Sequence, residues 1–159
     1  MKEKFISIKY YEYNSIEELN EKDKILLIRA IEATNGSYAP YSKFNVGAAV
    51  RLENGEIISA SNQENAAYPS GLCAERTTIF YANSKFPNSA IISMAVVAKT
   101  NGELTKEPTY PCGACRQVLE ESQTRGGKPI RIIIGSGEKI QIIESVKDLL
   151  PFAFNNLPE

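Results

Sequence analysis

The chain has 159 residues, of which 43% are hydrophobic, enough for one compact domain with its own core. Its 18 basic and 19 acidic residues give a formal net charge of −1. Because the basic residues are scattered, we expect neither nucleic acid nor a membrane surface as a partner. Residues 1–13 lack the apolar core of a secretory signal, and the cysteine count is odd. We therefore expect reduced thiols and a cytoplasmic protein.

The N-terminal part predicts an extended segment followed by a helix. Residues 1–14 alternate charged with apolar and aromatic side chains, which is typical of an extended chain. Ser15, with Glu18 three residues later, has the spacing of a capping box. Apolar residues then recur every three or four positions, so we expect a helix from Ser15 to about Thr34, ended by the Asn-Gly pair that follows.

The rest of the chain alternates predicted strands with predicted helices. Asn54-Gly55 between two apolar runs is a strong hairpin signal. Apolar runs and turn residues predict strands at 46–50, 57–60, 91–98, 130–134 and 140–143, and helices at 73–86, 112–126 and 145–151. This alternation predicts an α/β fold with three layers, α/β/α, around a mixed sheet of about five strands. We expect residues 15–159 to form one domain and residues 1–14 to be an extension.

All the cysteines, with one acid, fall into two short clusters. They are Cys73-Ala-Glu75 and, far along the chain, Pro111-Cys112-Gly-Ala-Cys115. Three thiolates can hold a zinc ion and leave its fourth tetrahedral position open to water, as in a catalytic site. The chain has no histidine and no fourth cysteine, so a closed cysteine and histidine site is excluded. Glu75 lies two residues after its cysteine and is a candidate proton shuttle for that water.

Both cysteine clusters fall at predicted helix starts. Free N–H groups in a first turn, and the positive end of the helix dipole, favour thiolate over thiol. Three thiolates around one zinc ion sum to a charge of −1, which would weaken the metal as a Lewis acid. Arg76, next to Glu75, can partly oppose that charge.

Two other interpretations stay open at this point. Cys112 and Cys115 have the spacing of a redox-active pair at a helix start, but that interpretation leaves Cys73 and Glu75 without a role. A non-catalytic module stabilised by a metal explains the cysteines and leaves Glu75 unexplained. A protein without bound zinc and with a readily cycled disulfide would favour the redox interpretation.

Four motifs together resemble the small cytidine deaminases. They are Tyr38-Ala-Pro-Tyr-Ser-Lys-Phe44-x-Val-Gly-Ala-Ala, Asn62-x-Glu64-Asn65-Ala-Ala-Tyr68, Cys73-Ala-Glu-Arg-Thr and Pro111-Cys-Gly-Ala-Cys-Arg-Gln117. The last two of these motifs together are the three-cysteine form of the zinc deaminase signature. The resemblance runs from about Tyr38 to Phe154, which is most of the chain.

The resemblance implies a role for each motif residue. It implies one zinc ion on Cys73, Cys112 and Cys115, Glu75 as catalytic acid and base, Phe44 against the pyrimidine ring, Asn62 and Glu64 at the ribose hydroxyls, and the Ala74 backbone at the base edge. It also implies a homotetramer with shared active sites, in which Ala66, Tyr68 and Phe154 reach a neighbour's substrate. Phe152 is bulky where relatives have a small residue, so which ring reaches the neighbour stays open.

The expected reaction is hydrolytic deamination of cytidine and 2′-deoxycytidine to uridine and 2′-deoxyuridine plus ammonia, in pyrimidine salvage. Glu75 would take a proton from the zinc-bound water and deliver it to ring N3 as hydroxide attacks C4. The Glu64 carboxylate accepts hydrogen bonds from sugar hydroxyls and repels a 3′-phosphate, which favours a free nucleoside. The alternative is a related deaminase of a modified nucleoside such as blasticidin S, which shares the cysteine motifs and diverges around the sugar site.

Overall fold

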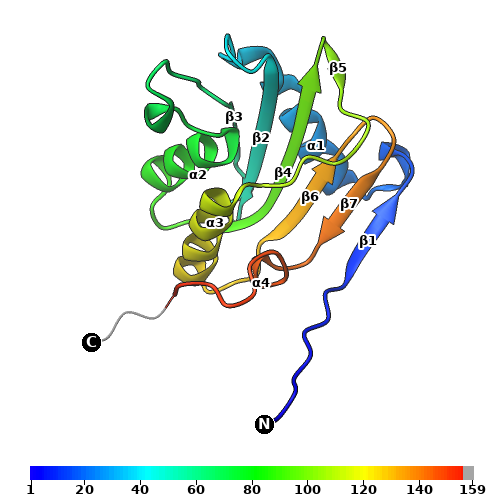
Figure 1. Ribbon diagram of the computed structural model, residues 1–159, viewed down its shortest axis with the longest axis vertical. Coiled ribbons are helices and arrows are strands. Elements are labelled where there is room, and N and C mark those ends of the chain that lie inside the picture. The colour runs from blue at the N-terminus through cyan, green and yellow to red at the C-terminus, as the bar shows by residue number, and fades with distance from the viewer. Residues whose placement is uncertain (156–159) are drawn as a thin grey trace.

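The computed structural model describes residues 1–155; the end of the expected domain, 156–159, lies outside the described residues. Seven strands in that described part form one sheet in the order β1-β7-β6-β4-β2-β3, with β5 paired to β4 (Figure 1). The strands are β1 Tyr10–Tyr13, β2 Phe44–Leu52, β3 Ile57–Ser61, β4 Ile91–Thr100, β5 Glu103–Leu104, β6 Arg131–Gly135 and β7 Ile140–Ile143. The helices are α1 Glu21–Ala33, α2 Ala74–Lys85, α3 Gly113–Gly126 and α4 Val146–Leu149, with short 3-10 turns at Ile16–Glu18, Thr34–Gly36 and Tyr68–Ser70.

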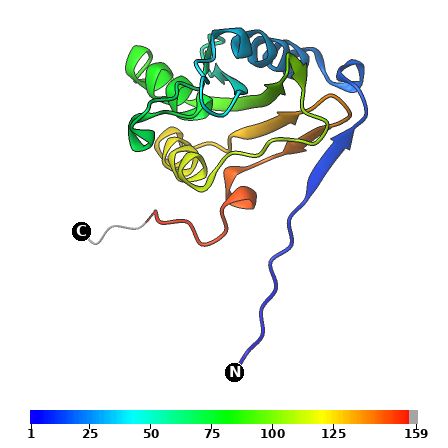
Figure 2. The ribbon, with the colours of Figure 1, turned by 45° about the horizontal axis from the view of Figure 1, so that its top comes forward.

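The sheet is mixed and covered on both faces. The β4–β6 pair is parallel and the other pairs are antiparallel. Helix α1 lies against one face, while α2, α3 and α4 lie against the other (Figures 1 and 2). The predicted three-layer α/β/α architecture is therefore confirmed. Within residues 1–155, no helix combines the length and apolar character needed to cross a membrane.

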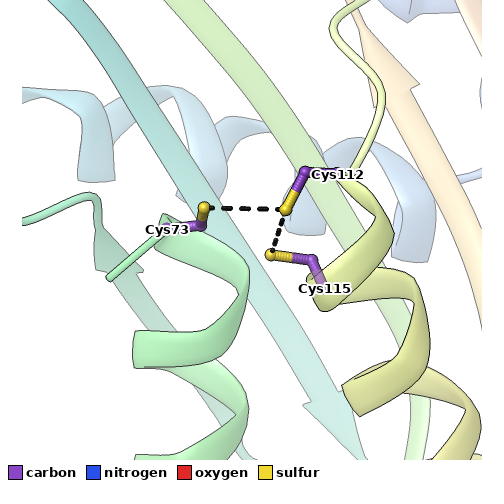
Figure 3. Close-up of side chains that lie close together, drawn as sticks. All are labelled: Cys73, Cys112 and Cys115. Carbon is purple, nitrogen blue, oxygen red and sulfur yellow. Dashed lines mark hydrogen bonds between the residues drawn. The ribbon is translucent and has the colours of Figure 1, made fainter. Parts of the chain in front are cut away.

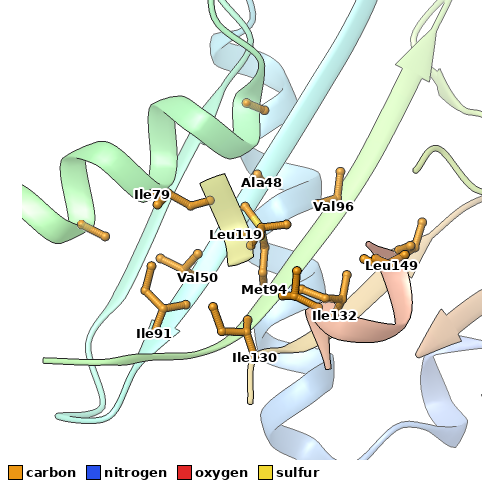
Figure 4. Close-up of a cluster of buried hydrophobic side chains, with 14 of the residues drawn as sticks. Ala48, Val50, Ile79, Ile91, Met94, Val96, Leu119, Ile130, Ile132 and Leu149 are labelled. Atoms are coloured by element: carbon orange, nitrogen blue, oxygen red, sulfur yellow. The ribbon is translucent and has the colours of Figure 1, made fainter. Parts of the chain in front are cut away.

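Side-chain alternation along the strands produces two hydrophobic cores. Met94 and Val96 of β4 and Ile132 of β6 pack with Ile79 of α2 and Leu119 of α3 (Figure 4). The residues between them, including Ala95, Val97 and Ile133, point to the opposite face and pack with Leu26 and Leu27 of α1. Successive strand residues face opposite sides of a sheet, so a sheet buried on both faces needs apolar residues at nearly every position, as β4 and β6 have.

The five predicted strands are all present, and the sheet gains two more. Strand β1, inside the expected extension, pairs with β7 from Tyr10 opposite Ile143 to Tyr13 opposite Ile140. Strand β5 has only two residues, too few to show a periodic pattern. Residues 1–9 form no regular secondary structure and project from the edge of the sheet beyond β1 (Figure 2).

The predicted start of the first helix at Ser15 is wrong. Helix α1 begins at Glu21 because Asn20 is its cap: the Asn20 Oδ1 atom accepts a hydrogen bond of 3.0 Å from the Asp23 N–H. The Asn20 Nδ2 atom also donates to the Asp23 carboxylate at 2.7 Å. The earlier Ser15 signal precedes only the 3-10 turn Ile16–Glu18, and its side chain makes no cap hydrogen bond.

The other predicted boundaries agree with the structure to within two residues. Gly55 adopts a φ of 90° in the β2–β3 hairpin, and Gly127 ends α3 with a φ of 64°; both lie in the left-handed region that favours glycine. Cys73 and Cys112 are the N-cap residues of α2 and α3. The two helices that carry the cysteines therefore begin beside each other on one face of the sheet (Figure 3).

Candidate active site

The three cysteine sulfurs lie together at the N-termini of α2 and α3. The Sγ atoms of Cys73 and Cys112 are 3.9 Å apart, and those of Cys112 and Cys115 are 3.5 Å apart (Figure 3). All three lie within 4.8 Å of one another, and they are unbridged thiols. Cys115 is buried, Cys73 is half-buried and Cys112 is exposed, so one side of the cluster is open.

The spacing of these sulfurs fits a zinc ion. Zinc–sulfur bonds of about 2.3 Å in a tetrahedron place the sulfurs about 3.8 Å apart, close to the 3.5 and 3.9 Å separations of the cluster. Three sulfurs occupy three corners and leave the fourth for water or substrate. Cysteine thiolates are also ligands that zinc prefers.

Backbone dipoles and Arg76 oppose the negative charge of such a cluster. The first-turn N–H groups of α2 and α3 place positive partial charge near the sulfurs. The Arg76 Nη2 atom lies 3.9 Å from the Cys73 Sγ atom. Hydrogen bonding from Cys115, helped by Arg76, lowers the pKa of Cys73 to about 5, while the same pairing raises the pKa of Cys115 above its ordinary value. Cys73 is therefore the first of the pair to ionise.

Glu75 lies in the first turn of α2 and is only 4% exposed. Burial raises the pKa of its carboxyl above the ordinary value, because the ionised form loses hydration. A carboxyl with a raised pKa can both accept and return a proton near neutral pH.

A cavity of about 740 Å³ opens beside the cysteines, within the range of about 300–1,000 Å³ that holds small molecules. Its lining includes Phe44, Asn62, Glu64, Tyr68, Glu75 and Arg76 from the expected set, with Cys73 and Cys112. Side chains from the first part of β2, the segment after β3 and both helix starts thus share one space. The strand order brings them together because β2 lies between β3 and β4.

The sugar-site candidates are held by hydrogen bonds within the protein. The Glu64 Oε2 atom accepts from the Tyr41 N–H at 2.9 Å and from the Ser42 N–H at 3.3 Å. Hydrogen bonding from the Ser42 side chain is the main cause that lowers the pKa of Glu64. Asn62 is buried and bonded to the main chain of Phe44 and Val46. The Glu64 carboxylate is therefore ionised and oriented before any ligand binds.

Of the remaining expected contact residues, only Tyr68 borders this cavity within residues 1–155. Ala74 is fully buried as the first residue of α2. Ala66 is exposed, and Phe154 is 67% exposed; neither lines the cavity. Tyr68 borders the cavity and is 75% exposed, with its ring at 6.0 Å and 64° to that of Tyr41. Tyr68 and Phe154 thus present aromatic surface outward.

Sequence reasoning missed several residues of the cavity wall. Tyr41, Thr109 and Tyr110 line it and were not among the expected contacts. A signal was present, because Thr109 and Tyr110 directly precede the Pro111-Cys112 motif and so must approach the helix start that carries the sulfur.

Comparison with known proteins gives a consistent result. Residues 20–126 match the family model of the cytidine and deoxycytidylate deaminase zinc-binding region. The cytidine deaminase of Halalkalibacterium halodurans is 43% identical over 134 residues, covering 83% of this chain and 94% of the relative. That of Sporosarcina psychrophila is 42% identical over 130 residues, covering 82% of this chain and 89% of the relative.

Solved structures resemble the fold as well. The crystal structure of cytidine deaminase from Burkholderia pseudomallei superimposes with a TM-score of 0.69 at 34% identity, covering 86% of this chain and all 100% of that one. That of Mycobacterium tuberculosis gives a TM-score of 0.67 at 31% identity, with coverage of 86% and 100%.

Proposed function

The chain belongs to the zinc-dependent cytidine and deoxycytidylate deaminase family, and on that premise we propose that it deaminates cytidine and 2′-deoxycytidine. The products are uridine or 2′-deoxyuridine and ammonia, as in pyrimidine salvage. One observation carries the proposal: three sulfurs lie within 4.8 Å of one another, and two of them, those of Cys73 and Cys112, border a cavity of nucleoside size that is also lined by the buried carboxyl group of Glu75. The relatives named above are cytidine deaminases, and none of them supports a blasticidin-type substrate.

Cys73, Cys112 and Cys115 are the proposed ligands of one zinc ion per chain. Their sulfur separations support this assignment, and the redox interpretation of Cys112 and Cys115 leaves the third sulfur beside them unexplained. A bound zinc ion supplies Lewis acidity, which lowers the pKa of a water molecule at the open position. Arg76 and the two helix N-termini offset the charge of the thiolates.

Glu75 is the proposed proton carrier of the reaction. Its carboxylate takes a proton from the attacking water and delivers it to ring N3 as the oxygen adds to C4. It then transfers the water's second proton to the amino group, and the bond from C4 to that nitrogen breaks to release ammonia. The raised pKa of the buried carboxyl supports this double role.

The other cavity residues are proposed to hold the nucleoside. Phe44 packs against the pyrimidine ring, the Ala74 backbone meets the base edge, and Asn62 with Glu64 binds the ribose hydroxyls. Both main-chain hydrogen bonds to Glu64 end on its Oε2 atom, which leaves acceptor capacity on the carboxylate for a sugar hydroxyl. Its negative charge disfavours a 3′-phosphate, which supports a free nucleoside rather than a polynucleotide.

Neighbouring subunits are proposed to complete each site in a homotetramer. Tyr68 and Phe154 project large aromatic surfaces outward, and buried aromatic residues are typical anchors of protein interfaces. Ala66, on the exposed loop before Tyr68, is the proposed main-chain contact from a neighbour. We further propose that residues 15–159 form one domain with residues 1–14 as an extension, and that the protein works in the cytoplasm, where thiols stay reduced.

The decisive experiment measures cytidine loss on zinc-loaded protein. Glu75→Gln should keep one zinc ion per chain and lower kcat about 1,000-fold, within the range for loss of a general acid and base. Glu121→Gln is the matched control, because it makes the same change at an exposed position of α3. Absence of cytidine and deoxycytidine turnover in the zinc-loaded wild type would refute the function. A near-normal rate for Glu75→Gln would refute its role alone.

A further inference from the structure

One wall of the cavity is formed by the aromatic side chain of Tyr110, which is hydrogen-bonded to the part of the sheet that contains β7 and β1. Tyr110 lies two residues before Cys112 and lines the cavity with Phe44 and Glu75. The residue is 46% exposed, so part of its surface is accessible at the cavity. Its hydroxyl group donates a hydrogen bond of 2.5 Å to the Oε1 atom of Gln141 in β7. That bond fixes the position of the far end of the ring.

The Gln141 amide is in turn oriented by a carboxylate of the N-terminal strand. Gln141 is 8% exposed, and its Nε2 atom donates a hydrogen bond of 2.8 Å to the Oε2 atom of Glu12 in β1. An ionised carboxylate can only accept hydrogen bonds. Glu12 therefore requires the NH₂ group of Gln141 on its own side, which turns the amide oxygen toward the Tyr110 hydroxyl.

Strand pairing places these groups in line. Glu12 lies directly opposite Gln141 in the antiparallel β1–β7 pair, and directly opposed residues project to the same face of a sheet. The segment between β5 and α3 passes in front of β6 on its way to α3 (Figure 1). Tyr110 belongs to this segment and therefore lies close enough to Gln141 for the hydrogen bond. Two hydrogen bonds thus connect the N-terminal extension to the cavity wall.

We propose that Tyr110 is a substrate-contacting residue and that Glu12 and Gln141 are its positioning residues. The chain of hydrogen bonds from Glu12 through Gln141 holds the Tyr110 ring against the cavity, so a nucleoside meets a wall that is already ordered. Without it, binding must also restrict the ring's rotation, and that entropy cost weakens binding. This inference rests on the proposed nucleoside substrate, and it gives the N-terminal extension a role in substrate affinity.

The test compares four single variants for cytidine turnover. Glu12→Ala and Tyr110→Phe should each raise KM about three- to ten-fold, the factor for one lost hydrogen bond, and leave kcat within about two-fold. Glu12→Gln should raise KM less than Glu12→Ala, because its amide oxygen still accepts from Gln141 although its NH₂ group no longer excludes the flipped Gln141 amide. Glu3→Ala, which removes a charge from an exposed residue of the same extension, should change nothing.

The double variant Glu12→Ala with Tyr110→Phe separates this chain of contacts from a general structural effect. Because both changes break the same connection, the double variant should have the KM of Tyr110→Phe alone. An unchanged KM in Glu12→Ala, multiplied effects in the double variant, or an equal fall in kcat would overturn the proposal.

Amide hydrogen exchange gives a readout that does not depend on turnover. In zinc-loaded protein without nucleoside, Glu12→Ala should speed deuterium uptake in residues 105–111, and Glu3→Ala should not. Equal uptake in Glu12→Ala and the wild type would refute the connection even if cytidine is the substrate. Faster uptake in Glu12→Ala than in the wild type, together with a zinc-loaded wild type that fails to deaminate cytidine, would support the connection while the proposed function fails.

Discussion

Asn62 holds the main chain of Phe44, because its Nδ2 atom donates a hydrogen bond of 2.9 Å to the Phe44 carbonyl oxygen. Its Oδ1 atom accepts from the Val46 N–H at 2.8 Å and from the Ser37 hydroxyl at 2.5 Å. Asn62 is 9% exposed and uses most of its hydrogen-bonding capacity inside the protein. A residue proposed for the sugar thus also sets the position of the residue proposed for the base.

Asn62→Asp should therefore damage both stability and binding. The carboxylate cannot donate to the Phe44 carbonyl oxygen and places two acceptors in contact, which costs about 1–3 kcal/mol in the free energy of unfolding. KM for cytidine should rise as Phe44 loses its position. Urea unfolding and steady-state kinetics measure the two effects. Asn65→Asp is the control, because within residues 1–155 its side chain only accepts a hydrogen bond, from the Ala67 N–H at 2.9 Å; equal effects at both positions would contradict the prediction.

Removing the metal should expose the chemistry of the cysteine cluster. Protein stripped of zinc by a chelator should lose activity, melt at a lower temperature and titrate three accessible thiols per chain when unfolded, while one equivalent of zinc restores activity. Stripped protein should also form a Cys112–Cys115 disulfide under mild oxidant, since those sulfurs are 3.5 Å apart, and zinc-loaded protein should resist it. Full activity in metal-free protein would be incompatible with this arrangement.

Gly47→Ala should destabilise the fold because α1 packs directly on this position of β2. A Cβ atom there would lie 2.0 Å from the Ala30 carbonyl oxygen and 2.8 Å from the Thr34 nitrogen, both backbone atoms. Relief requires movement of α1, so we expect a loss of about 3 kcal/mol or more in unfolding free energy. Gly113→Ala, with open space around the added atom, should change it by about 1 kcal/mol or less. Similar urea midpoints for both variants would disprove the close approach.

Shared active sites predict that two defective chains repair each other. Phe154→Ala should raise KM if its ring completes a neighbour's site, whereas Phe152→Ala should have a smaller effect. Refolded mixtures of Glu75→Gln and Phe154→Ala chains should be more active than either parent, because some sites combine an intact Glu75 with a neighbour's intact Phe154. Light scattering should report four chains per particle. A fully active monomer on dilution would exclude the shared sites.

Local sequence patterns predicted the elements well where the cause of the structure is itself local. Asn54-Gly55 predicted the hairpin because the turn needs residues that tolerate positive φ, and Cys73 and Cys112 fell at helix starts as expected. The same reasoning misplaced the start of α1, since Ser15 and Asn20 are both suitable caps and only packing selects one. In the folded protein Asn20 makes two hydrogen bonds to Asp23, and these favour Asn20 over Ser15 as the cap.

Residue types and their short-range spacing determined the chemistry of this protein: three thiols, one adjacent acid and no histidine leave few metals and few reactions possible. Tertiary structure alone decided which distant groups meet. The Cys73 and Cys112 sulfurs are 39 positions apart in sequence, Tyr110 and Gln141 are 31 apart, and Glu12 and Gln141 are 129 apart. Such contacts depend on strand order and register, which arise from burial of both sheet faces at once, and a local pattern cannot specify them.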